Sequence, residues 1–136
     1  QERVIPVMED ASVSTVIQLM REHAQKRLVV VDDANRVIGI LTERDILERV
    51  SNGDRSKVLA LLSGQTLEGT QHLPQTASEL MTAPVITVRE VDSALVALKL
   101  LMDNGIKRLP VVAATGQPIG LIGRAGLIRV LMRSAT

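Results

Sequence analysis

An internal repeat constrains this chain of 136 residues more than any other feature. Displacing the sequence by 81 positions aligns residues 4–50 with residues 85–131 without a gap, and 13 of the 47 aligned pairs are identical. Many other pairs are conservative, such as Ile17 with Leu98 and Ile46 with Leu127. The repeat predicts two copies of one supersecondary unit rather than an open array.

Each copy has the pattern of a strand, a helix, two strands and a second helix. In the first copy Pro6 favours an edge strand, and apolar residues recur at helical spacing after a cap at Asp10 or Ser12. A β-branched run and a polar turn then predict a buried strand and a hairpin. The expected elements are a strand at 4–7, a helix over about 13–20, strands at 28–31 and 36–41, and a helix from Thr42.

The second copy opens with a capping-box pattern, Thr76 to Glu79. Gly105 is a suitable stop for its first long helix. Between the copies we expect a linker with a short helix at 58–62, so the predicted domains are 1–53, 54–75 and 76–136. The expected elements of the second copy are a strand at 85–88, a helix over about 92–104, strands at 109–112 and 119–122, and a helix at 127–132.

The composition narrows the classes of function. Trp, Tyr and Phe are absent, so the chain has none of the large aromatic rings on which nucleic-acid bases usually stack. A net charge of +1 is too small to indicate a nucleic-acid or membrane partner, and the absence of Cys excludes thiol chemistry. No membrane-spanning run or signal peptide is visible, so we expect a cytoplasmic segment without direct membrane contact. Because the chain begins at Gln1 without Met, we expect a processed chain or a piece of a larger protein.

The segment from Gly39 to Asp45 carries the candidate binding chemistry. It has the pattern of a strand turning into a helix, with Gly39 leaving room for close approach and Thr42 as the cap. N–H groups at a helix start favour an anion, and the carboxylate of Asp45 suits the two hydroxyls of a ribose. The alternative is a simple capping box between Thr42 and Asp45, which this stretch by itself favours.

No catalytic centre is indicated. His23 and His72 lie far apart in the sequence, and neither belongs to a nucleophile, metal-ligand or paired-carboxylate pattern. The acidic residues are scattered, as solvated surface charges usually are. We therefore expect a protein that is not an enzyme and requires no cofactor.

The two copies resemble a tandem pair of CBS domains, named after cystathionine β-synthase. The resemblance rests on Lys-Arg-Leu-Val-Val-Val from Lys26 and Lys-Arg-Leu-Pro-Val-Val from Lys107, each after a helix containing Leu-Met. The segment 80–85 fits the family's entry to a repeat, and only the linker lies outside the resemblance. The resemblance implies an α/β fold of two β-α-β-β-α repeats packed about a pseudo-twofold axis, with small mixed sheets flanked by helices.

The resemblance also implies a site for an adenosine-containing ligand in the cleft between the repeats. Its motif Gly-hydrophobic-x-Thr/Ser-x-x-Asp, which holds ribose and phosphate, matches Gly39, Thr42 and Asp45. Candidate ligands are AMP, ADP, ATP and S-adenosylmethionine. Arg44 or Arg108 would assist at the phosphate, where Lys107 would supply a point charge. The candidates for the adenine pocket are Pro84, Val85, Ile86, Thr87, Ile106 and Lys107.

The second copy departs from this motif. Gly123 and Gly126 stand at the positions of Thr42 and Asp45, so neither the hydroxyl nor the carboxylate is present. One competent site is therefore expected. The second cleft, bounded by residues 4–5 and 25–26, is expected to be empty or to bind something else, with Arg124 as a weak anion option.

The function expected from the resemblance is regulatory ligand sensing. An adenine nucleotide would tighten the packing of the two repeats and pass that change to an effector domain on the same or another chain. The alternatives are a structural or dimerising module that binds no small molecule, and a pair that gates a transporter or enzyme on the same polypeptide. A homodimer is expected because the helices at 95–102 and 127–132 are apolar around most of their circumference.

Overall fold

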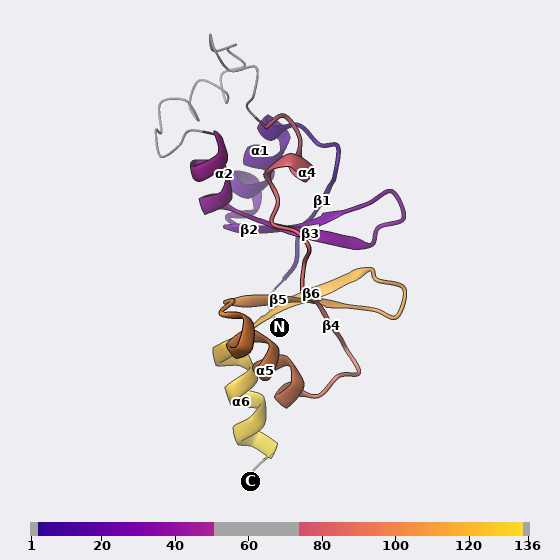
Figure 1. The fold of residues 1–136 in the computed structure, drawn as a ribbon, viewed down its shortest axis with the longest axis vertical. Helices are drawn as coiled ribbons and strands as arrows, with labels where there is room; N and C mark the ends of the chain where they lie inside the picture. The colour runs from indigo at the N-terminus through magenta and orange to yellow at the C-terminus, as the bar shows by residue number, and fades with distance from the viewer. Residues whose placement is uncertain (1–2, 51–73, 135–136) are drawn as a thin grey trace. The chain divides into compact units, whose positions relative to one another are not determined.

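A computed structural model describes residues 3–50 and 74–134, which form two compact units. Among these residues, the first unit comprises 5–34, 38–50 and 74–85, and the second comprises 3–4, 35–37 and 86–134. Each unit holds a three-stranded sheet with helices packed beside it (Figure 1). The α/β class and the small sheets flanked by helices are thus confirmed.

The sheet of the first unit has the strand order β1-β2-β3, and β1 runs parallel to β2. Pro6 lies in the edge strand, as its missing N–H predicts. Ser12 is the N-cap of the first helix and accepts a hydrogen bond from the Thr15 N–H at 3.2 Å. The elements are β1 (Pro6–Met8), α1 (Val13–His23), β2 (Arg27–Val31), β3 (Val37–Thr42), α2 (Glu43–Val50) and α4 (Ala77–Leu80).

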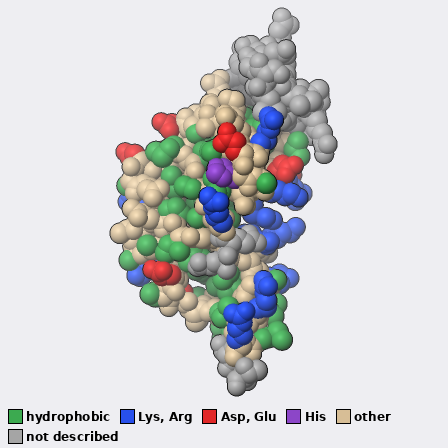
Figure 2. All heavy atoms as spheres, turned by 180° about the vertical axis from the view of Figure 1, so that it is seen from behind, with side chains coloured by type: hydrophobic (Ala, Val, Ile, Leu, Met, Phe, Trp, Pro, Cys, Tyr) green, Lys and Arg blue, Asp and Glu red, His purple; other side chains and the backbone are tan. Residues whose placement is uncertain are grey.

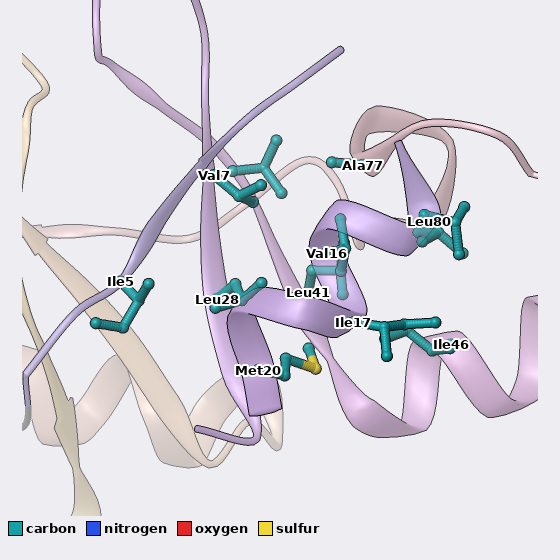
Figure 3. Close-up of a cluster of buried hydrophobic side chains, with 12 residues drawn as sticks. Ile5, Val7, Val16, Ile17, Met20, Leu28, Leu41, Ile46, Ala77 and Leu80 are labelled. Carbon is teal, nitrogen blue, oxygen red and sulfur yellow. The ribbon is translucent and has the colours of Figure 1, made fainter. Parts of the chain in front are cut away.

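The core of the first unit is entirely aliphatic and lies between α1 and the sheet (Figure 3). The helix contributes residues at helical spacing, and β2 is buried from its second residue onward. The buried residues are Ile5, Val7, Val13, Val16, Ile17, Met20, Leu28, Val30, Leu41, Ile46, Ala77 and Leu80.

Helix α4 completes this core although the repeat pattern assigns its sequence to the second copy. The predicted cap forms with a shifted return arm: the Glu79 N–H donates to Thr76 Oγ1 at 3.4 Å, but Glu79 Oε2 accepts from the N–H of Gln75, one residue before the cap, at 3.1 Å. Ala77 and Leu80 are then buried in the first unit. The helix predicted at 58–62 and His72 lie outside the described residues.

The sheet of the second unit has the order β4-β5-β6, with β4 parallel and β6 antiparallel to β5. Gly105 ends the long helix in the left-handed conformation, as predicted, and the two helices of this unit pack together. The elements are β4 (Val88–Arg89), α5 (Ala94–Asn104), β5 (Arg108–Val112), β6 (Pro118–Gly123) and α6 (Arg124–Ser134). None of the helices in residues 3–50 and 74–134 has the length and apolar character needed to cross a bilayer.

The strand predicted at 85–88 is wrong in its extent, because β4 contains only Val88 and Arg89. In the first unit the Val29 N–H donates to the Ile5 carbonyl at 3.1 Å and extends the parallel pairing. Pro110 stands at the equivalent position of the second copy and has no N–H to donate. The parallel pairing is therefore shorter in the second unit.

Candidate functional site

The candidate site begins in β3, where Gly39 is buried beneath the side chain of Met81. A Cβ atom at residue 39 would overlap the Met81 thioether, so the position admits only glycine unless Met81 moves. The segment after α4 pairs with β3 through two backbone bonds. The Thr82 N–H donates to the Ile40 carbonyl at 2.9 Å, and the Ile40 N–H donates to the Thr82 carbonyl at 3.3 Å.

Thr42 and Asp45 form the capping box that the sequence offered as the alternative. The Asp45 N–H donates to Thr42 Oγ1 at 3.2 Å. In return Asp45 Oδ2 accepts from the Thr42 N–H at 2.8 Å and from Thr42 Oγ1 at 3.0 Å. The other carboxylate oxygen, Oδ1, accepts from Thr82 Oγ1 at 3.3 Å. The half-buried carboxylate of Asp45 is thus oriented by groups from two segments far apart in the sequence.

This carboxylate retains the capacity to bind a hydroxyl. A carboxylate offers about four acceptor positions, and three donors use Asp45 here. The bond from Thr82 is the longest of the three, so a ligand hydroxyl can join it or replace it at Oδ1. Because Asp45 is held at a strand–helix junction, it requires little reorganisation to accept a diol.

The start of α2 is less open to an anion than its sequence suggests. The Glu43 N–H donates to the Lys26 carbonyl at 2.9 Å, and the N–H groups of Thr42 and Asp45 are used by the capping box. The first turn of α2 also carries the carboxylates of Glu43 and Asp45, which oppose negative charge at this end. Any phosphate held here must be neutralised by basic side chains.

Arg44 is one such side chain. Its Nε lies 2.9 Å from Glu48 Oε1 in an ion pair whose side chains are 83% and 61% exposed. Exposed pairs at this helical spacing contribute only about 0.3–0.5 kcal/mol, so Arg44 can exchange Glu48 for a phosphate at little cost.

The remaining predicted residues are divided between the two units. Pro84 is exposed and Val85 half-buried in the first unit. In the second unit Ile86 and Ile106 pack against the core, Thr87 is half-buried and Lys107 is exposed. Gly39, Thr42 and Asp45 are therefore brought together within the first unit.

The sequence did not reveal Met81 and Thr82 as parts of this site. Both belong to the segment that resembles a family entry, but their contacts with Gly39 and Asp45 depend on tertiary pairing. No local spacing signals that pairing. Among residues 3–50 and 74–134 there is also no cluster of three or more metal-ligating side chains, and His23 is exposed in the last turn of α1.

Comparison with known proteins identifies relatives across nearly the whole chain. The family profile described as the CBS domain matches residues 1–52 and 77–133. An uncharacterized 17.7 kDa protein of Acidianus ambivalens is 29% identical over 130 residues, which are 96% of this chain and 68% of that protein. Inosine-5′-monophosphate dehydrogenase of Mycobacterium tuberculosis is 41% identical over 96 residues, which are 70% of this chain and 14% of the dehydrogenase.

A solved structure shows the same fold. The crystal structure of CBSX2 in complex with AMP matches with a TM-score of 0.68 and 24% identity, over 99% of this chain and 90% of that one. In sequence, CBSX2 of Arabidopsis thaliana is 28% identical over 138 residues, which are 93% of this chain and 58% of CBSX2. The chain thus spans from about a seventh to two thirds of the length of these curated relatives.

Proposed function

The chain belongs to the CBS domain family, and from that premise we propose that it is a regulatory module that binds an adenosine-containing ligand at the Thr42–Asp45 corner. The observation that carries the proposal is the Asp45 carboxylate, which is oriented from two sides and still has acceptor capacity. The complex of CBSX2 with AMP supports the ligand class.

In the proposed complex the ribose hydroxyls donate to Asp45, and one of them joins or displaces Thr82 at Oδ1. The predicted segment 84–87, which includes Ile86, contacts the adenine together with Ile106. Arg44 and Lys107 neutralise the phosphate, which the acidic start of α2 cannot do. A ligand held by residues from both copies would tighten their packing, and this differential binding is what a regulatory signal requires.

We further propose that this signal reaches an effector domain on the same or another chain. In inosine-5′-monophosphate dehydrogenase the matched segment is a small part of a longer enzyme, which supports such an attachment. The competing possibility is a structural module, in which Thr42 and Asp45 serve only as a helix cap. The hydrogen bonds within the capping box are compatible with that possibility, so a binding experiment must decide between them.

The absence of Trp, Tyr, Phe and Cys makes the binding experiment simple, because the chain absorbs little in the near ultraviolet where adenine absorbs strongly. After equilibrium dialysis against AMP, ADP, ATP or S-adenosylmethionine, excess absorbance on the protein side measures the bound ligand. We expect at least one of these ligands to bind and to raise the melting temperature. If none of these ligands binds at millimolar concentration, the chain is a structural module and Thr42 and Asp45 serve only as a helix cap.

Asp45→Ala tests the site itself. It removes charge-assisted bonds to the ligand, so we expect binding to weaken at least about tenfold. The lost cap should cost about 1 kcal/mol of folding stability, which leaves the protein folded. Glu48→Ala on the same helix is the matched control: it frees Arg44 from a pair worth only about 0.3–0.5 kcal/mol, so it should not weaken binding and should tighten it by no more than about twofold. Equal affinity of the Asp45→Ala variant and the unmodified chain would refute the assignment.

A further inference from the structure

We propose that the second unit carries a docking groove for a short capped helix of a partner protein. A groove of about 190 Å³ lies between β4, the start of α5 and α6. Its apolar lining includes Val88, Ala94, Ala97, Val111, Ile122 and Leu127. The groove lies wholly within the second unit, because residues 88–130 supply its entire lining.

The repeat places this groove where the first unit holds α4 (Figure 1). In the described part of the second unit no helix corresponds to α4. The core residues that Ala77 and Leu80 of α4 join in the first unit are therefore the counterparts of the groove residues. Displacement by 81 positions relates Val7, Val16, Val30, Leu41 and Ile46 to Val88, Ala97, Val111, Ile122 and Leu127.

Backbone carbonyls of the segment before α1 hold α4 in the first unit. The Ala77 N–H donates to the Ala11 carbonyl at 2.9 Å. The Ser78 N–H donates to the Glu9 carbonyl at 3.0 Å. N–H groups in the first turn of a helix have no partner within the helix, so these two carbonyls supply what α4 needs at its start.

The second unit presents the same two acceptors before α5. The counterparts of Glu9 and Ala11 are Glu90 and Asp92. Within residues 3–50 and 74–134, the backbone carbonyls of Glu90 and Asp92 accept no hydrogen bond. Glu9 and Ala11 are half-buried beside α4, whereas Glu90 and Asp92 are exposed. An incoming helix can therefore pair its first N–H groups with these carbonyls.

The apolar part of the groove is also less covered than its counterpart. Leu41 is fully buried in the first unit, but Ile122 is only half-buried in the second. Val130, another lining residue, is 42% exposed, and Val91 beside the groove in sequence is 76% exposed. Figure 2 shows apolar side chains at the surface over the part of the molecule where Figure 1 places α6. Covering these side chains would favour the docked state.

These features define the chemistry of the occupant. It needs an N-cap hydroxyl, a small residue in its first turn and a leucine three residues later, as Thr76, Ala77 and Leu80 provide in α4. A second copy of the chain does not offer its α4, because Ala77 and Leu80 are 0% exposed in their own unit. Pockets for drug-sized molecules usually enclose about 300–1,000 Å³, so about 190 Å³ suits two side chains of a docked helix better.

The test is an NMR titration of the ¹⁵N-labelled full chain with a synthetic peptide of residues 75–82, acetylated and amidated at its ends. We expect saturable shifts of the Glu90, Asp92 and Ala94 amides. The Kd should be on the order of 1 mM, because so short a peptide is scarcely helical alone and must be ordered on binding. A peptide with Leu80→Ser should bind at least about tenfold more weakly, since it lacks the apolar side chain.

Ala94→Glu tests the groove in the chain itself. It places a charge beside apolar groove residues, so peptide binding should weaken about tenfold or more. An acidic residue in the first turn of α5 favours the helix, so the fold should persist. Ala125→Glu is the matched control, since it makes the same change in the first turn of α6 outside the groove. It should change the affinity less than about twofold.

Four outcomes would overturn the proposal. The first is an absence of saturable shifts up to about 10 mM peptide. The second is equal weakening by Ala94→Glu and Ala125→Glu, and the third is a response confined to residues 9–13, where the peptide would only exchange with α4. The fourth is a shift of the Glu90 and Asp92 amides with protein concentration alone, which would assign the groove to a second copy. The groove uses none of Gly39, Thr42 and Asp45, so this proposal and the proposed function can fail independently.

Discussion

Met81 explains why residue 39 is a glycine, because its side chain lies where a Cβ atom would project. Gly39→Ala should therefore lower the free energy of unfolding by about 1–3 kcal/mol, through overpacking in the core of the first unit. The measurement is urea denaturation followed by circular dichroism. In a Met81→Ala background the same substitution should cost less, and strictly additive costs in this double-mutant cycle would contradict the contact.

At the scale of single residues, the sequence predicted what depends on local spacing. The capping box between Thr42 and Asp45 follows from a separation of three residues, and both of its arms are present. Thr82 was not predicted, because it reaches Asp45 from 37 positions away, through pairing with β3. The repeat shows that residue 126 is Gly where the first copy has Asp45, but it does not show the small cavity that Arg108 and Arg129 line beside it.

At the scale of elements, α1 and α5 end with a residue in the left-handed conformation. Gly105 has a φ of 62°, whereas the equivalent residue of α1 is Ala24, with a φ of 51°. An L-residue in this conformation carries about 1–2 kcal/mol of backbone strain. Glycine removes that strain, but part of the gain is offset because glycine raises the conformational entropy of the unfolded chain. Ala24→Gly should therefore stabilise the chain by about 0.5–1 kcal/mol in urea denaturation.

Ala34→Gly is the matched control for this prediction, since Ala34 is exposed but does not have a positive φ. It should give no stabilisation, because glycine then only adds freedom to the unfolded chain. If both glycine substitutions change the stability equally, the left-handed cap of α1 is not the source of the effect.

The strand and helix runs were predicted to within a few residues wherever apolar periodicity and caps agree, as at Ser12 and Gly105. The exceptions have tertiary causes. β4 is shortened by Pro110. Its missing N–H matters only because β4 pairs along this edge of β5. Likewise, the capping box of α4 is visible in the sequence, but the core that its Leu80 enters is not.

At the scale of the whole molecule, the duplication predicts two similar units, and the structure contains two small sheets with flanking helices. The boundaries of the compact units nevertheless differ from those of the repeat, because α4 packs with the first unit. The apolar surface is also distributed unequally. Leu95 and Met102 of α5 and Met132 of α6 are 64%, 60% and 65% exposed.

Such exposed side chains on two packed helices predict a homodimer, since a solvated helix usually presents one apolar stripe to its own core. We expect sedimentation to show a dimer at tens of micromolar, a concentration that requires only about 6–7 kcal/mol of association free energy. The double substitution Leu95→Glu with Met102→Glu should shift the chain to monomer, because the charges would have to be buried without partners. Val91→Glu is the control, since Val91 is 76% exposed but precedes α5, and it should leave the dimer intact. A monomeric unmodified chain at that concentration would contradict this use of the apolar surface.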